Sequence, residues 1–462
     1  MFPTGAGDET VAILPAMPPA ALPSTRPASQ MPVRILIDPS AYWHRNIGDM
    51  AMLEVALARL RAYWPHAAID IITLDSETMS AVDPDMRPVS PYGAMGWNAD
   101  AVLVRDATPL SPGRGYVLKT CHGLRRSDNW LMTGIGRAAL LAKGHDPSLL
   151  SRYLDAVRRA DLVLMTGAGS INESFKKSAF VRMETLELAL EAGAVTALVG
   201  QGIGPISDPI LKRRVAQVLP RVDLLALREG VASPALLKEM GMSERRLRIT
   251  GDDAITVAYS ARAENMGSCI GVNLRIAGYS GIDRDLASAI GRVVRNVAGR
   301  HDTSLVPLPV SRLDEDDDLR TIRDMLDMEA MSQDQLPDPR TPAEFVSLLP
   351  RCRIVVAGSY HAAVFALSMG LPTVGIACSQ YYVDKFTGLR DQFGTDCSVV
   401  LTNSPSFLTE MEAAVDAAWF AAQDARPRLL SAARRQIAKS EAVYDEIFSL
   451  VELRSSGARQ RT

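Results

Sequence analysis

Short apolar runs alternate with amphipathic helical patterns along most of this chain, and this rhythm restricts its fold more than any other feature. Runs this continuous are typical of parallel strands that are buried on both faces. The first round of alternation therefore predicts a doubly wound α/β domain. Its runs are RILID (34–38), IDIITL (69–74), VLV (102–104), DLVLMTG (161–167), VTALVGQG (195–202), DLLALR (223–228) and RLRITGD (246–252).

A second α/β round begins after the polar segment at 258–268. Its apolar runs are CIGVNLR (269–275), TSLVPLPV (303–310), RIVVAG (353–358) and PTVGIA (372–377). Two rounds predict two Rossmann-like parallel-sheet domains that face a central cleft, with ligands bound outside the carboxyl ends of the strands. The expected organisation is a disordered Pro/Ala-rich leader at 1–32, an N-terminal α/β domain at 33–262 with an insertion at 105–160, a C-terminal α/β domain at 263–425, and a C-terminal helix and tail at 426–462, in which the strongest helical pattern covers 427–450.

The composition limits the kinds of ligand and the cellular location that we expect for this protein. The net charge of -3 favours a small or neutral ligand over nucleic acid. Five scattered cysteines without a CxxC pair indicate neither a disulfide framework nor a zinc site, so we expect a cytoplasmic location. The leader has no signal-peptide pattern, and no apolar stretch is long enough to span a membrane. Any membrane contact is expected to be peripheral.

The segment NIGD, between the first apolar run and the first long helical pattern, is the first candidate site. Asn46 and Gly48 suit a tight βα turn, and Asp49 is expected to cap the helix. Free amides at such a helix start also favour an anion or a sugar hydroxyl. The spacing leaves both interpretations open.

The glycine-rich segment MTGAGSINES (165–174) resembles a dinucleotide fingerprint but lacks its third glycine, because Asn172 stands at that place. A Rossmann cofactor site is therefore not favoured. Gly169 and Ser170 would form a loop that a phosphate or sugar can approach closely, with the carboxylate of Glu173 at its edge. A loop that only reverses the chain is the alternative.

Polar residues also stand at the ends of other apolar runs. Gln201 and Gly202 end one run, Arg228 ends the next, and Asn273 and Arg275 end the first run of the second round. A lone arginine at the end of an apolar strand needs a carboxylate or an anion. A structural ion pair and an anion-binding role are both open for Arg228.

His361 follows the run RIVVAG and stands at the start of an apolar helical pattern. A lone histidine beside apolar residues is most often a buried structural residue, and this stretch alone favours that interpretation. No histidine has a partner at HxxxH spacing, so no metal site is predicted. The acidic run DEDDD (314–318) is expected to complement a helix N-terminus. Lys385, after a later strand end, is available for an anion.

Taken together, NIGD, the glycine segment with its acid, GQGIGP, the arginine of LREGVAS, GVNLR and SYHAAVFALSMGLP resemble the polysaccharide pyruvyl transferase family. The match runs in order from about 34 to 395. The family is similar in fold to the two-domain GT-B glycosyltransferases. The resemblance implies transfer of the enolpyruvyl unit of phosphoenolpyruvate onto sugar hydroxyls of a surface polysaccharide or its lipid-linked precursor, giving a pyruvate ketal, with no metal or redox cofactor.

This reaction needs a proton donor, a base and cations for phosphate and carboxylate. By resemblance, His361 is the proton donor or base, and Arg228 binds the donor anion. Backbone amides at Gly169, Ser170 and Tyr360 would contact the same anion. Asp49 and Glu173 are candidates for orienting acceptor hydroxyls.

The chain departs from the family at Ser359, because many members carry arginine two residues before the histidine, although the form S-[FY]-H also occurs. We expect Arg275 or Lys385 to supply the missing cation. The alternatives are a GT-B glycosyltransferase that uses a nucleotide sugar and a non-catalytic member of the fold.

Overall fold

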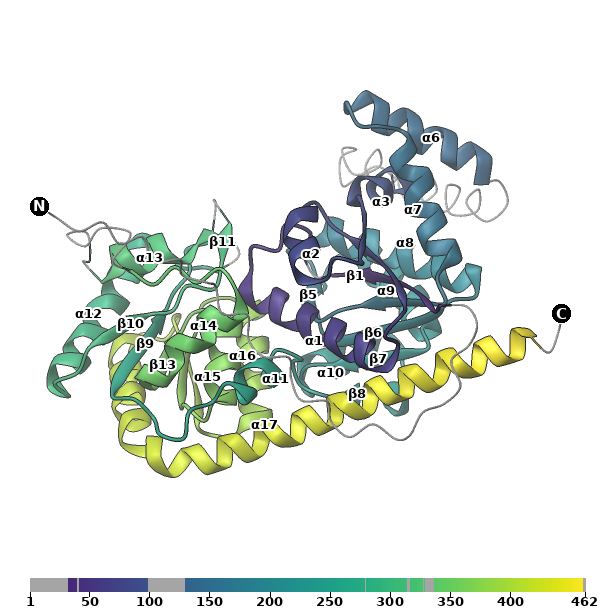
Figure 1. The fold of residues 1–462 in the computed structure, drawn as a ribbon. Coiled ribbons are helices and arrows are strands. Elements are labelled where there is room, and N and C mark those ends of the chain that lie inside the picture. Colours follow the sequence, from purple (N-terminus) through teal and green to yellow (C-terminus); the bar gives the residue numbers. More distant parts are fainter. Residues whose placement is uncertain are drawn as a thin grey trace, which may run out of the picture. The chain divides into compact units, whose positions relative to one another are not determined.

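The computed structural model describes residues 32–39, 41–98, 129–278, 280–313, 316–326, 328 and 336–459. Within them lie two sheets whose neighbouring strands all run parallel and one two-stranded antiparallel sheet (Figure 1). This confirms the predicted fold of two parallel-sheet α/β domains.

The first sheet has the strand order β3-β2-β1-β4-β6-β7-β8, and β5 pairs with β6. The strand order reverses between β1 and β4, and ligands of such sheets bind outside the carboxyl ends at the reversal. The elements of this domain are β1 (Arg34–Asp38), α1 (Ile47–Tyr63), β2 (Ala68–Ile72), α2 (Ser76–Val82), β3 (Arg87–Val89), α3 (Pro91–Trp97), α6 (Asn129–Ala142), α7 (Ser148–Arg159), β4 (Leu162–Met165), β5 (Ala168–Ile171), α8 (Lys176–Ala192), β6 (Val195–Ile203), α9 (Pro209–Val218), β7 (Leu224–Leu227), α10 (Ala232–Glu239), β8 (Leu247–Ile249) and α11 (Ile255–Ser260).

The second sheet has the strand order β10-β9-β13-β14-β15, which reverses between β9 and β13. The loop after β9 carries Arg275, and α15 with His361 follows β13. The elements of this domain are β9 (Cys269–Asn273), α12 (Arg284–Arg300), β10 (Leu305–Pro307), β11 (Arg312–Leu313), β12 (Asp316–Asp317), α13 (Asp318–Met325), α14 (Pro342–Leu348), β13 (Cys352–Ala357), α15 (Tyr360–Ser368), β14 (Thr373–Ala377), α16 (Gln380–Phe393), β15 (Cys397–Leu401) and α17 (Phe407–Arg459).

Two elements differ from the sequence prediction. Gly169 and Ser170, expected in a loop, lie in β5, because the long strand β6 pairs first with β4 and then, farther along, with β5. The last helix begins at Phe407 rather than near residue 427, because Pro427 lies inside the helix instead of marking its start. Predictions for 1–31, 102–104 and 105–128 lie outside the described residues; the rest of the predicted insertion forms α6 and α7.

Two expectations from composition can be compared with the structure. The four cysteines within the described residues are free thiols. Of the helices that the structure describes, none has the length and apolar character that crossing a membrane requires.

Helix α17 packs against both α/β domains, as its yellow ribbon in Figure 1 shows. Near its start, Met411 and Val415 join the apolar core of the second domain. Near its end, Tyr444 and Phe448 pack with the apolar residues of β1 and β2. The helix therefore contributes to the core of each domain.

A buried carboxylate fastens α17 to the first domain. Asp253, which follows β8, accepts hydrogen bonds from Ser440 Oγ and from Tyr444 Oη (3.0 Å), both on α17. Nη1 of Arg59 on α1 lies 3.4 Å from Oδ1 of Asp253. Burial raises the pKa of Asp253, against the opposing charge of Arg59. Two helices and the β8–α11 loop thus meet at one carboxyl group.

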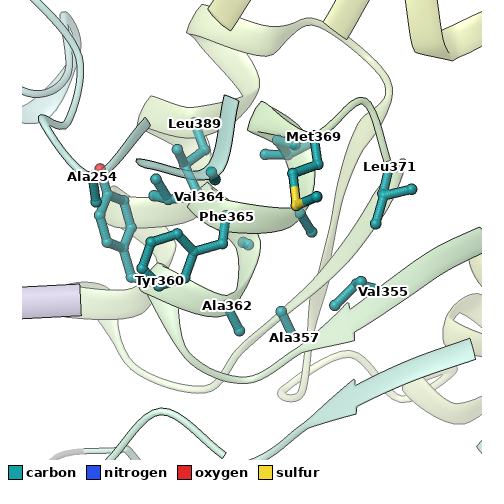
Figure 2. Close-up of a cluster of buried hydrophobic side chains, with 14 of the residues drawn as sticks. Ala254, Val355, Ala357, Tyr360, Ala362, Val364, Phe365, Met369, Leu371 and Leu389 are labelled. Atoms are coloured by element: carbon teal, nitrogen blue, oxygen red, sulfur yellow. The ribbon is translucent and has the colours of Figure 1, made fainter. Parts of the chain in front are cut away.

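The helix that carries His361 is surrounded by apolar side chains (Figure 2). All nine residues of α15 are buried, as expected for a helix without a polar face. The same cluster contains Val355 and Ala357 of β13 and Ala254 from the β8–α11 loop of the first domain. Because one core holds this loop and α15, the side chains that they carry are held close together.

We predict that Asp253→Ala lowers the free energy of unfolding by about 3 kcal/mol, because it leaves the partly buried Arg59 and two hydrogen-bond donors of α17 without their carboxylate. Glu446→Ala is the matched control: it removes a half-exposed ion pair between α17 and Arg248. The control should cost at most about 1 kcal/mol. Urea unfolding measures both variants, and equal losses would contradict the role assigned to Asp253.

Candidate active site

The NIGD turn lies directly against the ring of His361. Asn46 is the N-cap of α1, and its Oδ1 accepts hydrogen bonds from the N–H groups of Gly48 (3.0 Å) and Asp49 (3.3 Å). Asn46, not Asp49 as expected, therefore caps the helix, and Asp49 lies in its first turn. A Cβ at position 48 would lie 1.9 Å from Cγ of His361. The close approach requires glycine.

His361 lies in the first turn of α15, at the carboxyl end of β13. Ser359 is the N-cap of this helix, and its Oγ accepts a hydrogen bond from the N–H of Ala362 (3.4 Å). The His361 side chain is 10% exposed, and its Nε2 lies 3.7 Å from Oδ2 of Asp252. The histidine is thus largely buried beside a carboxylate.

Arg228 follows β7 and is buried at 3% exposure. A Cβ on Gly169 or Gly202 would lie 2.6 Å and 2.7 Å, respectively, from the nearest guanidinium nitrogen. The guanidinium carbon lies 4.1 Å from the ring centroid of Tyr360, and Nη1 lies 3.9 Å from Oδ2 of Asp252. The two glycines therefore create the space that this side chain fills.

The electrostatic surroundings keep Arg228 charged. Burial alone would lower the pKa of Arg228, but the neighbouring Tyr360 and Asp252 outweigh it, and the pKa lies above the usual value. Burial raises the pKa of the Tyr360 hydroxyl well above its ordinary value, so this group stays a hydrogen-bond donor.

Lys385 of α16 is surrounded by three tyrosine rings. Its Nζ lies 3.7 Å from the ring centroid of Tyr381, 5.5 Å from that of Tyr382 and 5.6 Å from that of Tyr360. Such distances are typical of cation–π contacts. The same Tyr360 ring thus contacts Lys385 and Arg228.

Other charges also act on Lys385. Burial and the positive charges of Arg228 and Arg275 hold the pKa of Lys385 well below its usual range, against the opposing effect of Asp49 and Asp252. A cation with a lowered pKa beside two arginines gains from a bound anion. Lys385 thus lies near Tyr360, the neighbour of His361 in the chain, and its role as the missing cation stays a prediction.

The Asn273 and Arg275 side chains bind a carboxylate of the protein itself. Nε of Arg275 lies 2.6 Å from Oδ1 of Asp318, and Nδ2 of Asn273 lies 3.0 Å from its Oδ2. Asp317 caps α13, as expected for the acidic run, but Asp318 is fully buried in this network. These contacts join the carboxyl end of β9 to the start of α13.

Two predicted residues make other contacts. Glu173 is exposed and accepts hydrogen bonds from the backbone and hydroxyl of Ser207, which lower its pKa. Gln201 lies within β6, and its Nε2 donates to the carbonyl oxygens of Thr166 (2.6 Å) and Val199 (3.1 Å). Within the part of the chain that the structure describes, no hydrogen bond or ion pair joins either side chain to His361.

Two residues of the site were missed from the sequence. Asp252 stands three positions after Ile249, the last residue of β8, and lies at the same carboxyl edge of the sheet as Arg228. Tyr381 is the second residue of α16, and its hydroxyl donates to the carbonyl oxygen of Gly169 (3.1 Å). The position of Asp252 just after a strand could have identified it as a site residue from the sequence. No comparable sequence signal marked Tyr381.

Several polar atoms around this site have unused hydrogen-bonding capacity. Within the described part of the chain, Ser170 Oγ, Tyr360 Oη, Asp252 Oδ2 and His361 Nε2 are buried without a hydrogen-bond partner. Buried polar groups in folded proteins are nearly always paired. A bound polar ligand would supply the missing partners. No group of three or more potential metal ligands was found among the described residues.

The fold is that of the two-domain GT-B type, and solved structures of this type are similar to the chain. A putative UDP-N-acetylglucosamine 2-epimerase from Listeria monocytogenes has a TM-score of 0.50 and 14% identity, covering 90% of this chain and 98% of that chain. HepE of Anabaena, solved with UDP, has a TM-score of 0.51 and 12% identity, covering 91% of this chain and 100% of HepE. S. aureus MnaA, also solved with UDP, has a TM-score of 0.51 and 12% identity, covering 92% of this chain and 98% of MnaA.

At these identities the likeness establishes the fold alone. The family model for polysaccharide pyruvyl transferases matches residues 46–380. The chain therefore belongs to the polysaccharide pyruvyl transferase family. No curated protein sequence matches it.

We predict that Gly48→Ala displaces His361 and lowers the free energy of unfolding by about 1–3 kcal/mol, because the new methyl group overlaps the imidazole. Gly299→Ala is the control: a Cβ at this position in α12 meets no atom within 4 Å. The control should be neutral or stabilising by up to about 1 kcal/mol. Equal urea midpoints for Gly48→Ala and the unsubstituted protein would contradict the close approach.

Proposed function

We propose that this protein transfers the enolpyruvyl unit of phosphoenolpyruvate to sugar hydroxyls of a surface polysaccharide or its lipid-linked precursor. The observation that carries the proposal is the position of two cations, Arg228 and Lys385, on the ring of Tyr360, next to His361 in the chain. Phosphoenolpyruvate carries a phosphate and a carboxylate, so it needs at least two cationic groups.

Arg228 is suited to the phosphate or the carboxylate of the donor. Its planar fork can bind either group through two parallel hydrogen bonds. It is buried, fixed between Gly169 and Gly202, and remains charged. Lys385 supplies the second cation, in place of the arginine that many family members carry where this chain has Ser359. Arg275 adds positive potential, although its ion pair with Asp318 partly neutralises its charge.

The chemistry assigns an acid and base role to His361. The imidazolium gives a proton to the methylene carbon of the donor, and positive charge develops at the neighbouring carbon. A sugar hydroxyl adds to that carbon and loses its proton. Phosphate then leaves with both electrons of its C–O bond, and a second hydroxyl adds with loss of its proton. The products are the pyruvate ketal, whose methyl group holds the transferred proton, and inorganic phosphate.

Asp49 is our candidate for orienting the acceptor hydroxyls. It lies in the first turn of α1, directly after the glycine that contacts His361, and its charge acts on Lys385. Glu173 remains a weaker candidate, since Ser207 occupies its carboxylate. We propose that no redox cofactor takes part, because the reaction involves no net oxidation, and that protein cations stabilise the donor anions.

We predict that phosphoenolpyruvate binds and raises the melting temperature, whereas UDP does not. Calorimetry and thermal unfolding measure this without an acceptor. Arg228→Lys should weaken donor binding about tenfold or more, because it loses the two-pronged contact. Binding of UDP alone would instead support a nucleotide-sugar glycosyltransferase.

With a suitable acceptor glycan in D₂O, we predict release of inorganic phosphate and a ketal whose methyl group carries one deuterium. His361→Gln should lower this rate at least about 100-fold, because it removes the proton donor. Phosphorus NMR and mass analysis of the glycan measure the two products. Full activity of the His361→Gln variant would reject the mechanism.

Affinity for phosphoenolpyruvate should fall as pH rises through the lowered pKa of Lys385. The sign follows from charge: the ammonium form binds an anion, the neutral amine does not, so binding takes up a proton. Calorimetry at a series of pH values below the ordinary pKa of lysine measures this. Lys385→Met should bind weakly at every pH, and Lys439→Met, which changes an exposed lysine of α17, should leave the pH dependence unaltered.

A further inference from the structure

Asp252 is a buried carboxylate that faces Arg228 and His361. Its Oδ1 accepts a hydrogen bond from the N–H of Ala254 (2.9 Å). Its Oδ2 has no hydrogen-bond partner in the described residues and lies 3.7 Å from Nε2 of His361 and 3.9 Å from Nη1 of Arg228. One oxygen is therefore anchored, and the other is directed at the two functional groups.

The surroundings keep Asp252 ionised. Burial alone would raise the pKa of its carboxyl group, but His361, Arg228 and the N–H of Ala254 outweigh burial, and the pKa lies below its usual range. Asp253, the next residue, points instead into the contacts with α17. Two adjacent carboxylates thus serve different parts of the molecule.

The two nitrogens of His361 have different surroundings. Nε2 faces Asp252, whereas Nδ1 lies beside Gly48, where a Cβ would come within 2.1 Å of it. No hydrogen bond joins Nδ1 to any of the residues that the structure describes. Because position 48 is glycine, only backbone of the NIGD turn lies beside Nδ1, and no side chain from that position covers it.

We propose that Asp252 is a positioning residue that holds the Nε2–H of His361 and leaves Nδ1 to exchange the proton with the substrate. This inference rests on the proposed function. The 3.7 Å separation between Nε2 and Oδ2 is an ion-pair distance, and the negative charge of Asp252 favours a proton on the ring nitrogen that faces it. After transfer, the neutral ring keeps its proton on Nε2, and Nδ1 accepts the proton of the attacking hydroxyl.

Other titratable groups act on the same region: Arg228 at the end of β7, Lys385 on α16, Asp49 on α1 and Tyr360 on α15. Asp252→Asn replaces none of these residues, although it also removes the negative charge beside Arg228. Its side chain keeps nearly the same shape but loses the negative charge. Changes in His361 in this variant therefore report on the Asp252 charge.

The experiment compares Asp252→Asn with Asp253→Asn by nitrogen NMR of the histidine side chains, with the His361 signal identified by its loss in His361→Gln. In the unsubstituted protein we expect the neutral tautomer to carry its proton on Nε2. In Asp252→Asn the tautomer of the neutral ring should become mixed. The Asp253→Asn variant should lose stability while the His361 signal keeps its tautomer.

Phosphate release from phosphoenolpyruvate provides the second readout. Asp252→Asn should lower kcat about 10- to 100-fold. Asp253→Asn should keep kcat. An unchanged His361 tautomer in folded Asp252→Asn would overturn the inference.

Two further outcomes are decisive. If Asp252→Asn does not fold, the tautomer in the unsubstituted protein still decides, because a proton on Nδ1 would overturn the proposal. If the unsubstituted protein neither binds phosphoenolpyruvate nor releases phosphate from it, the proposed function fails, whereas the NMR comparison still tests the pairing of Asp252 with His361.

Discussion

A guanidinium remains charged inside a protein only where anions, dipoles or aromatic faces replace the water that it has lost. Arg228 meets this requirement through the carboxylate of Asp252 and the ring of Tyr360. Its position also explains the two glycines, since any side chain at 169 or 202 would occupy the guanidinium's place. Much of the local architecture follows from accommodating this one cation.

The site is assembled from both α/β domains. The first domain supplies Gly48, Arg228 and Asp252, and the second supplies Tyr360 and His361, each contact being direct. Residues of α1 and α11 share an apolar core with α15, so packing, rather than a flexible tether, sets the distances. Neither domain alone contains a complete set of polar groups.

Periodicity was sufficient to predict the two parallel sheets, because strands buried on both faces are continuously apolar. The strand-end positions of Arg228 and His361 were predicted for the same reason. The side-chain contacts were not predictable. Nothing in the sequence indicates that Arg275 pairs with Asp318, or that the Gln201 amide donates its hydrogen bonds to backbone carbonyls. Such pairings depend on how segments far apart in the chain are placed by tertiary packing.

Helix α17 has a consequence for the order in which the chain folds. Tyr444, Ile447 and Phe448 complete a core whose other members come mostly from the first half of the sequence. During synthesis, domains generally fold from the N-terminus onward. The first domain of this protein instead remains without part of its interior until residues 444–448 have left the ribosome, so apolar surface of its sheet stays exposed up to that point.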